Sequence, residues 1–283
     1  MPGQAVLDLL DGETLYHHGS LVTLGTELDR GDRLRRGAAR LADPSSGHES
    51  RWRSSLAYQF GLRHDLQVGF ALNTAELHRA AGAVELEGSG LGDLDLLVKW
   101  RVARFDAVGR ALNLAVIHSL SLPVGRDDAV SSGTRVEPEL QPGSGSVDPA
   151  LGFAVTHEPG RWRFNAATLY RWRLDTDGDG WRKGDELEAE LQVGNRFWLE
   201  PYPGPFARVD LGVRYEREST SRIGGVRQVA SGGERLLWTL DFAFRPRPAL
   251  DLQLGVDVPM WQRVGGTQYG TDWVVRFAVG YRF

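Results

Sequence analysis

The sequence predicts an all-β fold, a transmembrane antiparallel β-barrel of twelve strands with short periplasmic turns and long extracellular loops. Three observations support this prediction. Apolar and polar residues alternate with a period of two through most of the 283 residues. Aromatic residues gather towards the ends of the alternating segments. No stretch approaches the roughly 18 apolar residues that a membrane-spanning helix needs.

The alternation is clearest in the last segment of the chain. From Trp273 to Phe283 every odd position is apolar or aromatic, whereas the even positions are mostly small or charged. Because successive side chains on a strand point to opposite faces, this segment predicts a strand with one apolar face. The same pattern predicts twelve strands in chain order, at 20–29, 51–62, 65–74, 92–104, 111–122, 148–157, 161–173, 186–198, 207–215, 236–244, 250–260 and 273–283.

The connections between these segments fall into two classes. Those after the even-numbered strands are short, and those after the odd-numbered strands are mostly long, notably 30–50, 75–91, 123–147 and 217–234. Membrane barrels have short periplasmic turns, longer extracellular loops and an even number of strands. We therefore expect a single barrel over 20–283, preceded by a segment at 1–19 that either plugs the barrel or trails in the periplasm.

A soluble barrel or sandwich with an apolar interior would show the same alternation. Two features favour a membrane barrel whose apolar face contacts lipid. Aromatic residues stand at both ends of strands, as Trp162 and Trp172 do, and ten tilted residues rise about 26 Å, close to the ~25 Å apolar band of a membrane barrel. The polar faces also carry many Gly and Ala residues. Gly in a strand interior costs about 0.5–1 kcal/mol, and a crowded lumen gives a steric reason for it.

Composition and the N-terminus exclude several classes of protein. The formal net charge of −4, with no block of Lys and Arg, indicates that nucleic acid is not a partner. The absence of Cys excludes disulfides and a thiol nucleophile. The start, MPGQ, has no basic or apolar leader. Location in the outer membrane of a Gram-negative bacterium therefore requires that a signal peptide was removed and a start Met supplied.

The inward faces of the predicted strands carry charged residues of both signs. They form either a cross-strand network whose members neutralise one another or a polar track for a solute. Their balance of sign argues against strong ion selectivity. The candidate lumen-lining residues are Arg53, Asp95, Lys99, Arg101, Arg163, Arg171, Glu188, Glu190, Arg208, Asp210, Arg214, Asp241, Asp251, Asp257 and Arg276.

Two loops carry further candidate sites. The loop 123–147 is the one expected to fold inwards, where it would line a constriction; the alternative is a solvated surface loop. Its candidates are Arg126, Asp127, Asp128, Arg135, Glu137 and Glu139. The segment 175–186 fits the twelve-residue calcium-loop pattern, with Asp175, Asp177, Asp179 and Glu186 as ligands. The alternative is an acidic hairpin loop. Calcium is the one cofactor that the sequence suggests.

An enzymatic function is the competing class, because some twelve-stranded outer-membrane barrels are phospholipases with a His and a Ser two residues apart on the outer face. Here His118 points outward, but the residue two positions on is Leu120. Without an outward Ser the nucleophilic unit is missing, and we expect no enzyme activity and no catalytic residue.

Three stretches resemble one known family. GLGDLDLLVKWRV (90–102) resembles a "GLGDL…KYRL" strand, SLSLPVG (119–125) is similar to an "LPTG" strand end, and GSGSVDPALG (143–152) resembles a "GSGS-D" segment. They occur in the order found in the outer-membrane family named for the MetA pathway of phenol degradation. The resemblance implies a transporter linked to aromatic or hydrophobic compounds, and it supplies no binding residues.

The function expected from the sequence is passive passage of a small solute, hydrophobic or aromatic in character, through the barrel. The alternative is a closed structural barrel whose extracellular loops bind partners. The expected partners are the lipid bilayer and a small-molecule solute, and the sequence leaves the oligomeric state open.

Overall fold

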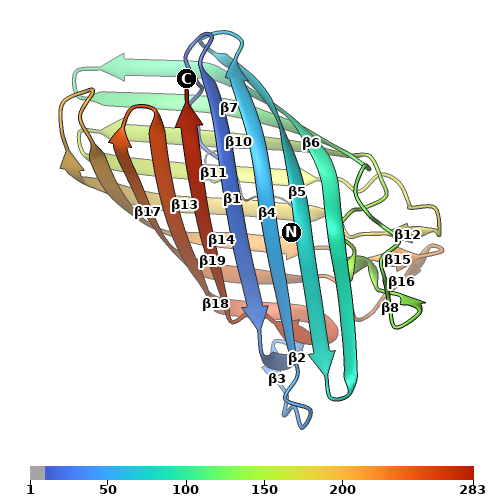
Figure 1. The fold of residues 1–283 in the computed structure, drawn as a ribbon. Coiled ribbons are helices and arrows are strands. Elements are labelled where there is room, and N and C mark those ends of the chain that lie inside the picture. Colours follow the sequence, from blue (N-terminus) through green and yellow to red (C-terminus); the bar gives the residue numbers. More distant parts are fainter. Residues whose placement is uncertain (1–9) are drawn as a thin grey trace.

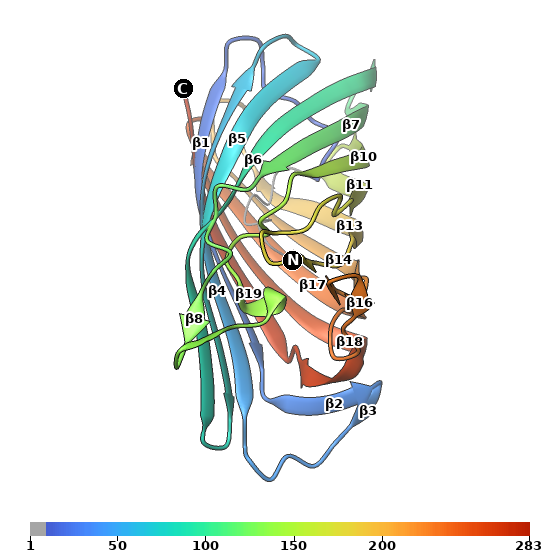
Figure 2. The same ribbon diagram turned by 90° about the vertical axis from the view of Figure 1, so that its right-hand side faces the viewer.

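The computed structural model describes residues 10–283 and shows a closed antiparallel barrel (Figures 1 and 2). Each of the twelve predicted segments overlaps one long strand, so the predicted fold class is confirmed. These strands are β1 (Ser20–Gly31), β4 (His48–Gly61), β5 (Leu66–Ala81), β6 (Val84–Ala107), β7 (Arg110–Leu122), β10 (Asp148–Pro159), β11 (Trp162–Arg171), β13 (Glu186–Leu199), β14 (Phe206–Glu218), β17 (Gly233–Arg247), β18 (Leu250–Gly270) and β19 (Trp273–Arg282).

The barrel closes by pairing its first strand with its last. Each long strand is hydrogen-bonded to the next along the chain, and β1 pairs antiparallel with β19 from Leu21↔Arg282 to Arg30↔Trp273. Closure leaves no long strand with an unpaired edge, which is the condition for a sheet to lie in lipid. The first and last strands, β1 and β19, therefore lie side by side in the wall (Figure 1).

One predicted connection is wrong. The stretch 75–91 was expected to be a long loop, but β5 continues to Ala81 and β6 begins at Val84, leaving a two-residue turn. Strand β18 likewise runs on to Gly270. The alternation fades in these extensions because both faces meet water beyond the apolar band. The backbone still pairs there, and these strands stand above the rest of the wall.

The long loops carry small elements of their own. A hairpin of β2 (Arg33–Gly37) and β3 (Ala39–Arg40) pairs with the extension of β18. Loop 123–147 contains β8 (Val130–Ser131), β9 (Thr134–Arg135) and the 3-10 helix η1 (Pro138–Leu140). A three-stranded sheet joins two other loops through β12 (Trp181–Arg182), β15 (Arg222–Ile223) and β16 (Val226–Arg227). We name this end of the barrel the long-loop rim, and the other the short-turn rim.

The two faces of the wall differ as the alternation requires. Outward residues such as Trp52, Phe153 and Leu191 are exposed, at 52%, 53% and 60% of their surface. Inward positions hold small and charged residues, among them fully buried Ala57 and Asp257. The apolar face of the wall is therefore the outer one, whereas in a soluble barrel the apolar face is the inner one. Within residues 10–283, no helix is long and apolar enough to cross a membrane.

Candidate functional site: the barrel interior

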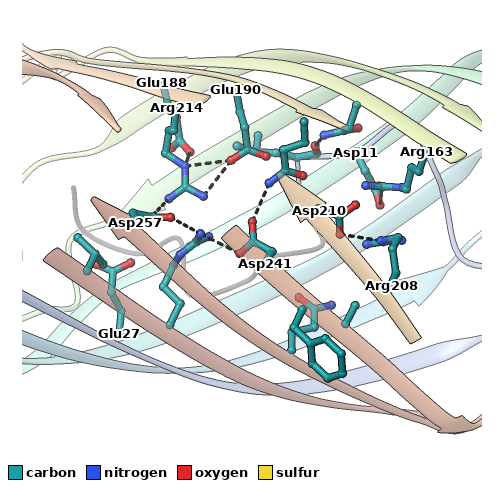
Figure 3. A pocket seen from close by; sticks show the side chains of 18 of the residues that line it. Asp11, Glu27, Arg163, Glu188, Glu190, Arg208, Asp210, Arg214, Asp241 and Asp257 are labelled. Atoms are coloured by element: carbon teal, nitrogen blue, oxygen red, sulfur yellow. Dashed lines mark hydrogen bonds and ion pairs between the residues drawn. The ribbon is translucent and has the colours of Figure 1, made fainter. Parts of the chain in front are cut away.

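A buried ion-pair network occupies one side of the lumen (Figure 3). Its first centre is Arg214 on β14, whose guanidinium lies 2.9 Å from Glu190 and 3.4 Å from Glu188 on β13. It also contacts Asp257 on β18 at 3.0 Å. One arginine thus joins carboxylates from strands on both sides of its own. Such a centre can hold its strands in register.

The second centre of this network is Arg276 on β19. Its guanidinium lies 2.7 Å from Asp257 and 3.0 Å from Asp241 on β17. Asp257 therefore bridges Arg214 and Arg276, and the network contains four carboxylates for two arginines. This side of the lumen is therefore acidic, although the formal charge of the whole chain is only −4.

Residues 10–15 of the N-terminal segment lie inside the barrel, whereas Tyr16, His17 and His18 are exposed. Residues 10–15 turn back through the short-turn rim into the lumen, and Asp11 lies 2.7 Å from Lys99 on β6 and 3.2 Å from Arg163 on β11. The Asn165 amide donates to the Leu10 carbonyl at 2.8 Å, and the Gly12 N–H donates to Thr156 at 2.9 Å. Residues 1–9 of the expected segment 1–19 lie outside the described residues.

Small side chains on the opposite half of the wall make room for this segment. Leu10 packs in an apolar cluster with alanines of β4, β5, β10 and β11, together with Leu97, Ile117 and Leu169. A methyl group added at Gly12 would lie 2.6 Å from the Asn113 carbonyl oxygen, so only glycine allows this close approach. The alanines and glycines noted on the inner face thus have a steric role: part of that surface seats the N-terminal segment.

Loop 123–147 folds into the other end of the barrel, as Figure 2 shows. Val136 and Leu140 are buried in an apolar cluster with Ala75 and Leu77 of β5. The Lys183 ammonium group donates to the Gln141 carbonyl at 2.9 Å and so ties this loop to the neighbouring one. The burial of Lys183 lowers its pKa to about 8, and the nearby Arg173 guanidinium acts in the same direction.

The remaining internal space is divided into small cavities. The network side holds a cavity of about 60 Å³, and a second of about 50 Å³ lies between Asp95, Arg171 and Gln141. A third, of about 100 Å³, lies under the long-loop rim, and a wider space of about 330 Å³ opens at the short-turn rim. The inner cavities have room for a few water molecules each, because one water occupies roughly 10–15 Å³ on this measure.

The structure places the predicted lumen-lining residues as follows. Twelve of the fifteen are buried, and Arg208 and Asp241 are partly buried with their charges paired inside the barrel. Arg101 is partly buried at the short-turn rim, where it donates to the His64 carbonyl at 2.5 Å. The twelve are Arg53, Asp95, Lys99, Arg163, Arg171, Glu188, Glu190, Asp210, Arg214, Asp251, Asp257 and Arg276.

Five of the six constriction-loop candidates, Arg126, Asp127, Asp128, Arg135 and Glu137, line none of these cavities. The charged groups of four of them form ion pairs outside these cavities instead. Arg126 pairs with Asp128, Glu137 with Arg79, and Arg135 with Asp177. The sixth candidate, Glu139, lines two of the inner cavities, and Gln141 and Pro142, which charge did not indicate, line one of them.

The four predicted calcium ligands are not brought together. The Glu186 carboxylate lies 2.5 Å from Arg173, whereas Asp177 and Asp179 both pair with Arg135. Asp175 accepts a hydrogen bond from the N–H of Thr176 at 2.8 Å. Over residues 10–283, no group of three or more His, Asp or Glu is arranged to hold a metal ion. Calcium binding by this loop stays a prediction, testable by titration calorimetry.

Fold and interior together define an outer-membrane type of β-barrel with a filled, charged lumen. The chain belongs to the family described as "MetA-pathway of phenol degradation", whose model matches residues 46–226. His118 faces outward at the β7–β10 pairing, opposite Leu151, and Leu120 follows on the same face.

Solved structures share the fold. An outer membrane channel from Pseudomonas putida F1 is 17% identical, with a TM-score of 0.75, over 98% of this chain and 100% of that one. The β domain of the Bordetella autotransporter BrkA is 10% identical, with a TM-score of 0.54, over 94% and 100%. The translocator domain of NalP from Neisseria meningitidis is 11% identical, with a TM-score of 0.51, over 99% and 93%. No curated protein matches the chain.

Proposed function

We propose that the protein is a channel of the bacterial outer membrane that lets a small solute pass when its N-terminal segment leaves the lumen. The single observation that carries this proposal is the placement of residues 10–15. They fill the lumen without belonging to its wall, and they are held by polar contacts such as Asp11 with Lys99 and Arg163. A purely structural core would be built from the wall strands themselves.

The described conformation is the closed one in this proposal. Its inner cavities of about 60, 50 and 100 Å³ are too small for an aromatic ring and its substituents to move through. Withdrawal of Leu10 and Asp11 would join the cavity beside the central network to the space at the short-turn rim, because Asp11 lines both. Passage thus requires that this segment leaves the lumen and that the small cavities beside loop 123–147 widen at the other end.

The wall suggests the character of the solute. The family description points to phenolic compounds, which combine an apolar ring with a hydroxyl group. After withdrawal of Leu10, one half of the wall would expose Ala57, Leu97 and Ile117, and the other half would present the charged network. A solute with a ring and polar substituents matches both halves, whereas a wholly apolar one would leave the buried charges unsolvated.

Planar-bilayer conductance and liposome swelling with phenol test this proposal. The variant Gly12→Val places a side chain against the Asn113 carbonyl and should expel the segment, since an added Cβ would lie 2.6 Å from that oxygen. We expect a small conductance in the unmodified protein and a several-fold larger one in Gly12→Val. Gly178→Ala is the control, because no atom lies within 4 Å of a methyl group there.

A closed barrel with a structural or surface-interaction role is the second candidate, and the small size of the inner cavities favours it. The two candidates give opposite results in the same experiment. If neither the unmodified protein nor Gly12→Val conducts ions or passes phenol, although both are folded and inserted, the channel proposal is wrong and the closed barrel is retained.

A further inference from the structure

The outer face of the barrel carries a row of charged residues at the long-loop rim. The register of β14, β17 and β18 places Arg217 opposite Glu234, and Glu234 opposite Arg263. Their chain neighbours Glu216, Arg235 and Gln262 point into the lumen, where Arg235 and Glu216 form an ion pair. Arg217, Glu234 and Arg263 therefore point outward, towards the surroundings of the barrel.

The rows next to this one show where a membrane surface would lie. Two residues further from the rim, the outward row is Tyr215, Leu236 and Trp261. Beyond it come Val213, Trp238 and Val258, and then Leu211, Leu240 and Val256. Aromatic residues are followed by aliphatic ones, the order expected from a membrane interface to the hydrocarbon. Two tilted residues rise about 5 Å, so Arg217 and Arg263 stand about 5 Å above the aromatic level, at the height of lipid headgroups.

Neither arginine is neutralised by the protein. Within residues 10–283, no carboxylate lies within ion-pair distance of Arg217 or Arg263. Glu234, which lies between them in register, accepts a hydrogen bond from the Tyr215 hydroxyl at 2.7 Å. Their strands are two apart, which places the two backbones about 10 Å from one another, and both guanidinium groups are therefore left to bind an anion.

A cleft beside this row extends the positive surface. It encloses about 610 Å³ at the long-loop rim, and arginines from four further elements line it together with Arg217 and Arg263. They are Arg36 on β2, Arg182 on β12, and Arg222 and Arg227, which face each other across β15 and β16. Lys183 adds a seventh cationic side chain, against the three carboxylates of Asp185, Glu218 and Glu234.

We propose that Arg217 and Arg263, with the arginines of this cleft, bind the phosphate groups of an outer-leaflet lipid. Arginine is suited to phosphate because its planar fork donates two parallel hydrogen bonds. The lipid is preferred to a free anion because the two arginines point away from the lumen and stand next to the aromatic level. The proposal rests on the membrane placement given above and not on solute passage, so a non-conducting barrel would leave it intact.

Native mass spectrometry of the full chain in detergent tests this proposal with three probes: diphosphoryl lipid A, the same lipid after removal of its phosphates, and inorganic phosphate. The test variant is Arg217→Gln/Arg263→Gln. The matched control is Arg63→Gln/Arg104→Gln, two arginines at the short-turn rim that pair with Asp65 and Asp106. Circular dichroism establishes that each variant is folded.

We expect the unmodified protein and the control to retain the diphosphoryl lipid equally. The double variant should bind it roughly thirtyfold more weakly, from about fivefold for each arginine at a membrane surface. Equal retention by the double variant overturns the proposal, and so does equal retention of the dephosphorylated lipid. If inorganic phosphate binds as tightly as the lipid, the site is one for a free anion and the lipid assignment is wrong.

Discussion

Arg214 illustrates how much of the interior depends on single buried side chains. Its guanidinium is shared by Glu188, Glu190 and Asp257, which come from strands on either side of its own. Each carboxylate has lost most of its hydration by entering the wall's inner surface. The arrangement is stable because the guanidinium replaces that hydration, and it becomes costly when one member is removed.

Arg214→Met should therefore lower the free energy of unfolding by about 3–5 kcal/mol, because it leaves buried carboxylates without their shared partner. Urea unfolding in detergent micelles measures this. The control is Arg104→Met, an exposed arginine paired with Asp106, for which we expect a change below about 1 kcal/mol. Equal changes in the two variants would show that water fills the place of the lost guanidinium.

Because of Lys183, the free energy of unfolding should depend on pH. Its pKa is lowered from 10.5 to about 8, mainly by burial. The unfolded chain therefore binds more protons than the folded one between these values, and stability rises with pH across that window. From pH 8 to pH 10.5 we expect a gain of up to about 3 kcal/mol. The gain should be absent from Lys183→Met, and a similar gain in that variant would assign it to other groups.

The elements differ in how far the sequence predicts them. All twelve long strands follow from alternation, because the pattern of Trp273 to Phe283 recurs wherever one face meets lipid. The lengths of β5, β6 and β18 do not follow from the alternation, because beyond the apolar band nothing in the residues distinguishes a paired strand from a loop. The alternation alone identifies which charged residues face the lumen, but it does not show which of them form ion pairs with one another.

The N-terminal segment shows what sequence patterns leave out. Leu10 and Asp11 have no periodicity to mark them, and the partners of Asp11 lie 88 and 152 residues away along the chain. The one available signal was chemical. The small residues Ala57, Ala71 and Ala154 leave space on the inner face that some other part of the molecule must fill.

A substitution at Gly88 would test how loop 123–147 is held at the long-loop rim. A methyl group at Gly88 would lie 1.8 Å from the Leu140 carbonyl oxygen, so Gly88→Val should push η1 away from the wall. We expect faster cleavage of the loop by a protease, by about tenfold, with the strands intact. Gly178→Ala again serves as control. Unchanged cleavage would mean that the loop adjusts without leaving its seat.

For the molecule as a whole, the outer rows of side chains should set its stability in a bilayer. Leu240 is 49% exposed and lies in the middle of the apolar face, between Leu211 and Val256. Leu240→Arg should cost about 2–4 kcal/mol in a bilayer. Val226→Arg, in a loop, should cost almost nothing. Folding into lipid vesicles with urea titration measures both, and equal effects would contradict a membrane-embedded wall.

The turn between β5 and β6 also has a practical consequence. These strands carry Gly82 and the exposed Ala83 beyond the rest of the wall, and the positive φ of Gly82, 63°, leaves Ala83 as the position for a new side chain. The chain has no cysteine of its own. In an outer membrane with the long-loop rim facing the exterior, a peptide tag or a single engineered thiol at Ala83 would be displayed on living cells, where an antibody or a maleimide dye could count assembled barrels without breaking the envelope.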